Sequence, residues 1–355
     1  MDSAHPTEEE PEINLPPDAA TEPSEYDREQ EAVFQISEAR DKIRSELSKV
    51  IIGQLEVIDE MLIALLSGGH CLITGAPGLA KTLLVKSISE LFHLSFNRIQ
   101  FTPDLMPADI TGTEMIRDTD EGRELVFQKG PIFANMILAD EINRTPPKTQ
   151  AALLEAMQEH QVTAAGETLK LEEPFFVLAT QNPIEMEGTY PLPEAQLDRF
   201  MFNIVIDYLN EDDEVKVVTQ TTGGGPEKIQ ALFDGSELRD YHAVVRRVPV
   251  ADEVVRYAVR LAAASRPGRE GTSAFVNDYV NWGAGLRAAQ FLILGGKTRA
   301  LLEGRTHVTI DDVRSLSGPV LRHRILPNYR AEAEGIGLPE IIDHLLEHVP
   351  THASK

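Results

Sequence analysis

The sequence predicts an α/β domain followed by a helical domain, and three observations support this fold class. An apolar strand pattern at Cys71–Thr74 runs into a glycine-rich turn, after which residues 83–91 show apolar side chains at helical spacing. Further apolar runs typical of buried strands follow at 134–139, 175–179 and 202–206. After the last run only helical segments are predicted. Strands that alternate with helices are typical of a layered α/β fold around a parallel sheet.

The turn after the first strand has the composition of a phosphate-binding loop. Gly75 and Gly78 let successive backbone N–H groups close on phosphate oxygens without a Cβ in the way. Lys81 can pair with β/γ-phosphates, and Thr82 can offer a hydroxyl to Mg²⁺. The usual pattern has glycine before the lysine, where this chain has Ala80; we expect a negative φ there, so that alanine fits at little cost. The alternative, an ordinary glycine turn, is disfavoured by the flanking strand and helix.

Length, charge and cysteine content exclude several classes of protein. A chain of 355 residues is too long for one compact core, so we expect one large and one smaller domain. The formal net charge of -24 argues against a nucleic-acid surface, although a basic pore inside an oligomer would be compatible with it. The single cysteine, Cys71, excludes an intramolecular disulfide and a cysteine zinc site. Because no apolar run reaches the roughly 20 residues that span a bilayer, and no signal-peptide pattern is present, we expect a cytoplasmic protein without a membrane segment.

The N-terminal part divides into a tail and two helices. Residues 1–28 are predicted to be a disordered acidic tail, because they are rich in Glu, Asp and Pro and nearly lack large apolar side chains. Such a tail can serve solubility or a specific contact. Apolar periodicity predicts helices over 29–50 and 56–66, the second leading to the glycine-rich turn. We assign 29–208 to the core domain.

Two acidic residues close the apolar run at 134–139. A buried strand would deliver Asp140 to a Mg²⁺ shell and place Glu141 to orient or deprotonate water. We expect the strands that bring Lys81 and Asp140 together to be adjacent. Both side chains would then reach one magnesium-bound triphosphate.

The segments around this run are less regular. A strand is predicted over 98–101, and two prolines and a glycine over 102–112 then break regular structure before a strand-like piece at 125–127. Residues 161–171 alternate apolar and polar side chains around Ala-Gly-Glu, which indicates a hairpin.

Asn182 follows the buried strand predicted at 175–179. Parallel sheets place their sites at the carboxyl ends of the strands, so Asn182 is a candidate sensor of the γ-phosphate and its attacking water. The alternative is a turn residue before Pro183.

Two arginines each allow two interpretations. Arg199 follows Asp198 just before the last core strand, and is either a surface ion pair with it or an arginine finger that reaches a neighbouring subunit's γ-phosphate. Arg287 lies in the first turn of a helix, where a cation opposes the helix dipole, so it is either solvated or compensated by an anion such as a γ-phosphate. We place the domain boundary near Leu209–Asp212 and the helical domain at 209–355.

These pieces, in this order, resemble the AAA+ ATPases, and more closely the MoxR family in the clade that also holds magnesium-chelatase ATPase subunits. The segments that carry the resemblance are Gly75–Thr82, with the alanine before lysine that is typical of MoxR proteins, Ile137–Arg144, Ala179–Pro183, Glu194–Phe200, Gly283–Gln290 and Val320–Ile325. The match extends from Val50 to Pro350. It departs from the family at Leu286, where proline is expected, and it does not explain the acidic N-terminus.

The resemblance implies a P-loop αβα sandwich with a five-stranded parallel sheet, an all-helical AAA+ lid, ATP at their junction, and an active ring, usually a hexamer. The positions that match the family's motifs are Thr82 and Asp140 for Mg²⁺, Glu141 for the catalytic base, Asn182 for sensor 1, Arg199 for the trans-acting finger and Arg287 for sensor 2. The implied nucleotide-binding set is Ile52, Gly53, Gly75, Ala76, Pro77, Gly78, Leu79, Ala80, Lys81, Thr82 and Leu83. Residues 103–112 and 161–171 would be inserts that face the pore or client.

The resemblance therefore implies a Mg²⁺-dependent ATPase that remodels a protein client. The implied role is chaperone-like maturation or metal-cofactor insertion, often with a partner that bears a von Willebrand A domain. Two other classes remain as alternatives. The acidic charge balance argues against a nucleic-acid motor. The presence of Glu141, Asn182 and Arg199 together argues against a nucleotide-gated scaffold that barely hydrolyses ATP.

Overall fold

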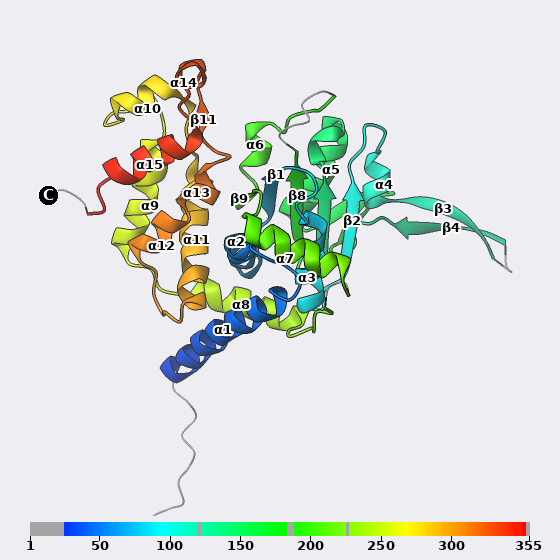
Figure 1. Ribbon diagram of the computed structural model, residues 1–355. Helices are drawn as coiled ribbons and strands as arrows, with labels where there is room; N and C mark the ends of the chain where they lie inside the picture. Colours follow the sequence, from blue (N-terminus) through cyan, green and yellow to red (C-terminus); the bar gives the residue numbers. More distant parts are fainter. Residues whose placement is uncertain (1–24, 120–121, 183–187, 225–226, 353–355) are drawn as a thin grey trace, which may run out of the picture.

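The computed structural model describes residues 25–119, 122–182, 188–224 and 227–352. Figure 1 shows a sheet lobe and a helical lobe side by side, with a long hairpin standing out from the sheet lobe. No helix in these ranges is long and apolar enough to cross a membrane.

A five-stranded parallel sheet forms the centre of the first lobe, as predicted. Its strands are β1 (Cys71–Gly75), β2 (Phe96–Gln100), β5 (Met136–Asp140), β8 (Phe176–Gln181) and β9 (Phe202–Ile206), in the order β2-β5-β8-β1-β9. The predicted adjacency of β1 and β5 is wrong, because β8 lies between them. This order brings the end of β8 into the middle of the site formed by the ends of β1 and β5.

Alternation along the strands explains why helices cover both faces of the sheet. Ile73, Leu138 and Leu178 belong to a buried cluster with α1 (Glu25–Leu47), α2 (Leu55–Ser67) and α3 (Lys81–Leu91). Their neighbours Leu72 and Ile137 belong to a second cluster with α5 (Pro147–Glu159). Since successive side chains of a strand point to opposite faces, apolar runs buried on both sides produce the αβα sandwich.

The N-terminal prediction is corrected at one end. Residues 1–24 of the predicted acidic tail lie outside the described residues, whereas Glu25–Arg28 begin α1 and are therefore helical. The buried side chains of α1 include Ile36, Ile43 and Leu47, and the helix contacts α11 (Leu286–Leu302) of the second lobe. This contact anchors the part of α1 from Ile36 onward to the second lobe.

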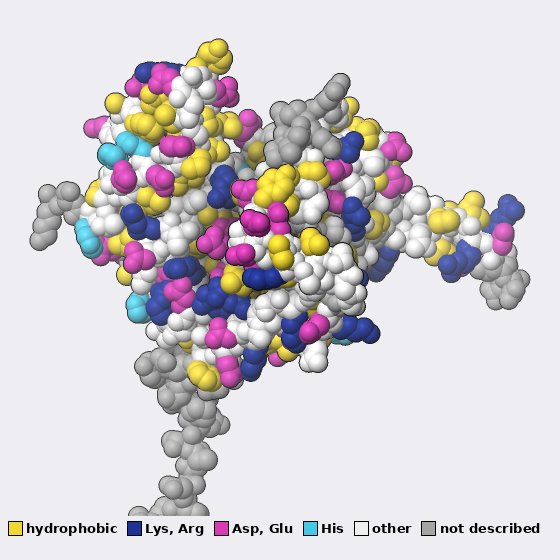
Figure 2. Space-filling model, viewed as in Figure 1, with side chains coloured by type: hydrophobic (Ala, Val, Ile, Leu, Met, Phe, Trp, Pro, Cys, Tyr) yellow, Lys and Arg dark blue, Asp and Glu magenta, His cyan; other side chains and the backbone are white. Residues whose placement is uncertain are grey.

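The two irregular segments contain hairpins. The predicted excursion at 102–112 includes a short helix, α4 (Pro107–Thr111), and leads into β3 (Gly112–Thr119), which pairs with β4 (Gly122–Lys129). Figure 2 shows this hairpin as an arm with hydrophobic side chains on its surface, and Met115, Ile116 and Leu125 are more than half exposed. The hairpin predicted at 161–171 is confirmed as β6 (Gln161–Ala164) and β7 (Glu167–Lys170). A short 3₁₀ helix, η1 (Ile142–Arg144), follows β5.

The second lobe is helical apart from one short antiparallel pair. The elements after the short helix α6 (Glu194–Leu197) and β9 are α7 (Glu211–Thr222), α8 (Gly235–Arg247), α9 (Asp252–Ala264), α10 (Ala274–Tyr279), β10 (Val280–Trp282), α11, α12 (Ile310–Ser315), α13 (Ser317–Leu321), β11 (Leu326–Pro327), α14 (Tyr329–Glu334) and α15 (Leu338–His348). The pairing of β10 with β11 was not expected from the sequence. One buried cluster runs from the sheet into α9, α11 and α15, so the lobes share a continuous core. The domain boundary near Leu209–Asp212 stays a prediction.

Candidate functional site

The glycine-rich turn joins the carboxyl end of β1 to α3. A Cβ added to Gly75 would lie 2.3 Å from the carbonyl oxygen of Ile206, so only glycine fits beside β9. Gly78 has φ +83°, and an added Cβ there would meet no atom within 4 Å. The loop therefore leaves open space in front of its backbone, at the end of a helix whose N–H groups attract anions.

Ala80 corrects the expected backbone geometry of this loop. Its φ is +54° and its ψ is 22°, so the prediction of a negative φ is wrong. The residue is the N-cap of α3, not its first helical residue, and the chain passes through the left-handed region to enter the helix. An alanine in that conformation costs about 1–2 kcal/mol, which explains why glycine is usual at this position.

Lys81 lies between the loop and the acidic residues at the end of β5. Its Nζ donates a hydrogen bond to the carbonyl oxygen of Gly75. Burial lowers the pKa of Lys81, and the charges of Asp140 and Glu141 act in the opposite direction. The structure thus brings the predicted lysine and both predicted carboxylates into one electrostatic environment, across the intervening strand β8.

Asp140 is held from two neighbouring strands. Its Oδ1 accepts a hydrogen bond from Thr180 Oγ1 at 2.6 Å, and its Oδ2 accepts from Arg98 Nη2 at 2.6 Å. Gln100 of β2 lies directly beside Asp140 in the sheet register. The carboxylate is partly exposed, so a ligand at the carboxyl edge of the sheet can reach it.

Glu141 has the strained backbone often found at functional positions. Its φ is +57°, in the left-handed region that costs a non-glycine residue about 1–2 kcal/mol. Its backbone N–H donates to Thr180 Oγ1 at 2.8 Å, and its Oε2 accepts from Gln100 Nε2 and Arg144 Nη1, each at 3.0 Å. These bonds hold the carboxylate at the edge of the sheet where the phosphate loop opens.

Thr180 is a site residue whose role sequence reasoning missed. One hydroxyl donates to the side chain of Asp140 and accepts from the backbone of Glu141, so it aligns both acids. Asn182, two residues further along the chain, is 7% exposed and lies just past the end of β8. The sequence signal was present, since Thr180 closes the same apolar strand as Asn182, but only the order of the strands pairs it with Asp140.

A cavity of about 300 Å³ lies beside the phosphate loop. Ile52, Leu79 and Leu83 line one side, and Val217 and Val218 of α7 line the other. A mostly apolar pocket that is partly open to solvent, next to a phosphate-binding turn, suits a planar nucleobase.

Gly53 lies at the edge of this region. It has φ +73°, and an added Cβ would come 2.7 Å from Asp213 Oδ2 of α7, so glycine lets α7 approach. Gly53 lines a neighbouring cavity of about 760 Å³, which Ile52 also lines. The predicted Ile52–Gly53 pair therefore lies between the two cavities.

Thr82 and Asp140 fit the requirements of Mg²⁺. Among the residues that the structure describes, no group of three His, Cys, Asp or Glu side chains could hold a metal by itself. Mg²⁺ usually takes one or two protein oxygens and completes its shell with water and phosphate oxygens. A hydroxyl and one partly exposed carboxylate beside an open phosphate loop match that donor set.

Arg199 lies away from the phosphate loop and contacts α5. Its Nη1 donates to the carbonyl oxygen of Leu154 in α5 at 3.0 Å. Asp198 instead accepts from Arg324 Nε at 2.8 Å, and its Oδ2 lies 3.8 Å from Arg287 Nη1. The interpretation of Arg199 as a surface ion pair with Asp198 is therefore wrong. Arg287 approaches Asp198, which directly precedes Arg199, so the two predicted arginines lie near each other.

These arginines lie toward the amino edge of the sheet. The backbone N–H of Met201 donates to the carbonyl oxygen of His70, and the first paired residues of β9 and β1 are Phe202 and Cys71. The phosphate loop follows the other end of β1. Five residues of parallel strand span about 17 Å, which is longer than an arginine side chain. Neither Arg199 nor Arg287 lines the cavity beside the phosphate loop.

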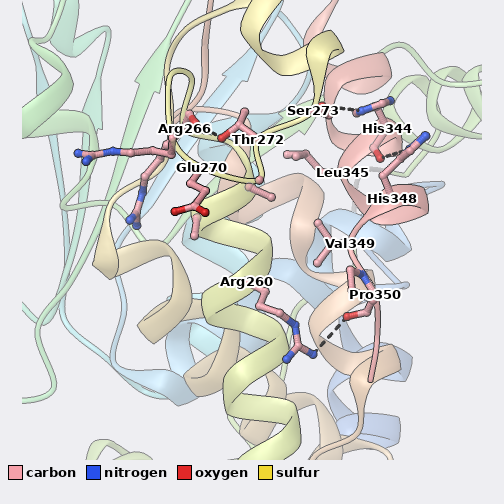
Figure 3. Close-up of a pocket in the computed structure, with 14 residues that line it drawn as sticks. Arg260, Arg266, Glu270, Thr272, Ser273, His344, Leu345, His348, Val349 and Pro350 are labelled. Carbon is pink, nitrogen blue, oxygen red and sulfur yellow. Dashed lines mark hydrogen bonds between the residues drawn. The ribbon is translucent and has the colours of Figure 1, made fainter. Parts of the chain in front are cut away.

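A separate cavity of about 710 Å³ lies in the helical lobe (Figure 3). Arg260 Nη2 donates to the carbonyl oxygen of Thr351 at 2.9 Å, and Ser273 Oγ lies 3.0 Å from His344 Nε2. None of the site residues predicted from the sequence lines this cavity. Arg260 anchors the chain after α15, and the nucleotide assignments do not involve this cavity.

Comparison with known proteins identifies the family. Residues 70–202 match the family model of the ATPase family associated with various cellular activities (AAA), and residues 273–345 match that of the AAA lid domain. The chain is 41% identical over 304 residues to "Chaperone MoxR1" of Mycobacterium tuberculosis, covering 86% of this chain and 80% of that protein. It is 37% identical over 304 residues to "Uncharacterized protein YeaC" of Bacillus subtilis, covering 85% of this chain and 92% of that protein.

A solved structure supports the same assignment. The crystal structure of a Cytophaga hutchinsonii protein, assigned as an ATPase, superposes with a TM-score of 0.85 at 40% identity, covering 92% of this chain and 98% of that one. The similarity thus includes the sheet lobe with its phosphate loop and the helical lid. The chain belongs to the MoxR family of AAA ATPases and is an ATPase.

Proposed function

We propose that the protein is a Mg²⁺-dependent ATPase whose hydrolysis site is completed by a second copy of the chain in a ring, usually a hexamer in this family. The observation that carries the proposal is the position of the arginines. The phosphate loop, Asp140 and Glu141 gather at the carboxyl edge of the sheet, whereas Arg199 and Arg287 lie toward the amino edge. An arginine that cannot reach its own nucleotide can reach that of a neighbour in a head-to-tail ring.

Within one subunit, the proposed roles follow from the contacts. Lys81 would pair with the β/γ-phosphates, and the apolar cavity lined by Ile52 and Val218 would hold the base. Thr82 and Asp140 would hold Mg²⁺, which supplies charge neutralisation at the phosphates when bound. Glu141 would orient or deprotonate the attacking water.

Three further residues would act on this site without taking the proton. Asn182 would sense the γ-phosphate from the end of β8. Arg199 and Arg287 would stabilise the transition-state charge in the neighbouring subunit, and Arg287 would therefore act in trans and not at its own phosphate. The resemblance implies ATP at the junction of the core and the lid, whereas in this proposal Arg287 of the lid acts on the ATP of the neighbouring subunit. The bond between Arg199 and the backbone of α5 would have to be exchanged for the phosphate during assembly.

The coupled work is proposed to be remodelling of a protein client. Support comes from a relative named a chaperone and from the β3–β4 arm, whose exposed Met115, Ile116 and Leu125 offer an apolar surface away from the nucleotide. Maturation of a metal-cofactor protein and a partner with a von Willebrand A domain are the specific forms that we expect.

Subunit mixing tests the trans arrangement directly. Lys81→Ala should lose ATP binding, and Arg199→Ala should bind ATP but lose turnover by about 10³–10⁵-fold, as expected for an arginine finger. In a 1:1 mixture, a Lys81→Ala subunit can donate its intact arginine to an Arg199→Ala neighbour. Random mixing should then restore roughly one quarter of the sites in a head-to-tail ring. A mixture no more active than its components would contradict completion of the site in trans.

A further inference from the structure

The chain's only tryptophan lies on the surface, next to the helix that carries Arg287. Trp282 ends β10 and is 65% exposed, and Leu286 at the start of α11 is also 65% exposed. We propose that this surface, formed by Trp282, Leu286 and Leu326 and called here the Trp282 surface, docks against the second copy of the chain that receives Arg199 and Arg287. The inference rests on the proposed function and names the contact that would hold the two half-sites together.

The Trp282 surface is held rigidly. Trp282 pairs with Leu326 across β10 and β11. A Cβ added to Gly283 would lie 2.3 Å from the carbonyl oxygen of Ser265, so the backbones are in close contact there. The backbone N–H of Ala284 donates to Ser265 Oγ at 2.8 Å.

A side chain of the lid cavity adds a further contact. Arg266, visible in Figure 3, donates through Nε to the carbonyl oxygen of Ala284 at 2.8 Å. A large aromatic side chain on a fixed backbone loses little conformational entropy when a partner covers it, which favours an interface anchor.

The Trp282 surface is continuous with the arginine cluster. Trp282 and Leu326 line one side of a cavity of about 570 Å³, and Glu194 and Asp198 of the sheet lobe line the other side together with Arg324. Asp198 is the carboxylate that Arg287 approaches and is the residue before Arg199. A partner that fills this cavity therefore comes to lie beside both arginines.

A second copy is the occupant that the molecule itself suggests. A head-to-tail contact joins two different faces of the same chain. The phosphate-loop half carries exposed apolar side chains beside the nucleotide cavity, among them Leu83 at 39% and Val218 at 59%. It also carries the acids Asp140 and Glu141, whose charge is opposite to that of the arginines. Both faces carry charges of both signs, and complementarity is expected where Arg199 and Arg287 of one copy meet the acids Asp140 and Glu141 of the other.

The fluorescence of Trp282 tests the proposal, because no other tryptophan contributes. The Glu141→Gln chain with ATP is titrated in concentration, while sedimentation reports assembly and acrylamide quenching reports access to the indole. We expect the emission to shift to shorter wavelength and quenching to fall as the ring forms. In an otherwise wild-type chain, Trp282→Ala should raise the concentration for half-assembly by about 10- to 100-fold, as loss of a buried aromatic anchor does.

Tyr329→Ala provides the matched control, because Tyr329 is an aromatic residue of the lid that is 83% exposed and does not line the cavity. It should leave assembly unchanged, and both variants should bind ATP like the wild-type monomer. If the ring formed while acrylamide still quenched Trp282 as in the monomer, or if Trp282→Ala assembled normally, the docking role of the Trp282 surface would be overturned. The proposed completion of the site in trans would not be affected. A chain that stays monomeric and hydrolyses ATP without Arg199 would overturn the proposed function together with this inference.

Discussion

The two edges of the central sheet differ in how their charged side chains are satisfied. At the carboxyl edge, Asp140 and Glu141 are partly exposed and contact side chains such as Arg98 and Arg144, which are themselves half exposed. At the amino edge, the guanidinium of Arg324 is almost fully buried, and its side chain is 1% exposed. One edge carries polar groups that a ligand can reach and the other carries groups already committed to the fold.

The hydrogen bonds of Arg324 show that its donors are used within the fold. Its nitrogens donate to the carboxylate of Asp198 and to the carbonyl oxygens of Asp198, Phe200, Met201 and Val320. Burial lowers the pKa of Arg324 to about 10 and Asp198 raises it, so the group stays charged near neutral pH. The difference teaches that the polar groups at the carboxyl edge, to which we assign the proposed water activation, stay accessible to a ligand, whereas the buried contacts at the amino edge form a rigid base from which Arg199 and Arg287 extend.

The largest effect expected at the carboxyl edge is the loss of a proposed catalytic side chain in a chain that still folds. Glu141→Gln should lower steady-state ATP turnover by about 10²–10⁴-fold, because the amide cannot take the proton of the attacking water. ATP binding, followed with a fluorescent analogue, should persist, since Lys81 and the nucleobase cavity are unchanged. The exposed Glu155→Gln on α5 is the control and should turn over normally. Wild-type turnover by Glu141→Gln would remove its role as the base.

The next largest effect is the loss of stability when a buried arginine of the amino edge is replaced. Arg324→Met should lower the free energy of unfolding by about 3–5 kcal/mol, because Asp198 and several buried carbonyl oxygens lose their donor. Arg287→Met should change it by no more than about 1 kcal/mol, since that pair is partly exposed and 3.8 Å apart. Denaturant unfolding followed by circular dichroism measures both. Equal losses from the two variants would contradict the contrast between a buried and an exposed arginine.

The pH dependence of stability tests whether polar groups at the amino edge are buried and held by the fold. His70 is buried at the start of β1, where Nε2 lies 3.0 Å from the carbonyl oxygen of Met157 and Nδ1 accepts from the N–H of Val177. Burial lowers the pKa of His70 to about 4, so the folded chain keeps it neutral. Between about pH 6.5 and 4 the unfolded chain binds a proton that the folded chain does not, so stability falls as the pH falls.

The size of this effect can be isolated by substitution. His70→Gln keeps one donor and one acceptor but cannot titrate. The stability difference between wild type and this variant should shrink as the pH drops from 7 to 4.5, by up to about 3 kcal/mol. Parallel pH profiles of the two proteins would show that His70 does not titrate differently on folding.

The smallest effect concerns the phosphate loop. Ala80→Gly should raise the free energy of unfolding by about 0.5–1 kcal/mol, because it removes a left-handed alanine while adding some entropy to the unfolded chain. Ala333→Gly, in the exposed face of α14, is the control and should lower it by about 0.5–1 kcal/mol. If Ala80→Gly destabilised the chain as much as the control, the left-handed conformation at Ala80 would carry no strain.

Local patterns predicted much of the candidate site. The glycines before Lys81, and an apolar run that ends in Asp140 and Glu141, are visible because strand period and turn chemistry act over a few residues. The predictions failed where the backbone path of a turn or the neighbours in space decide. Ala80 takes a positive φ because of how the turn enters α3, and Thr180 joins the site because β8 lies between β1 and β5.

The sequence by itself determined the alternation that buries the sheet on both faces, the phosphate loop and the carboxylates that end β5, since each depends on short-range periodicity. Only the tertiary structure decided the strand order, the bond from Arg199 to α5, and the pairing of Asp198 with Arg324 and Arg287. Those features join residues up to 131 positions apart, as in the pairing of Cys71 with Phe202. Contacts at such separations depend on how whole elements pack, which no local pattern records.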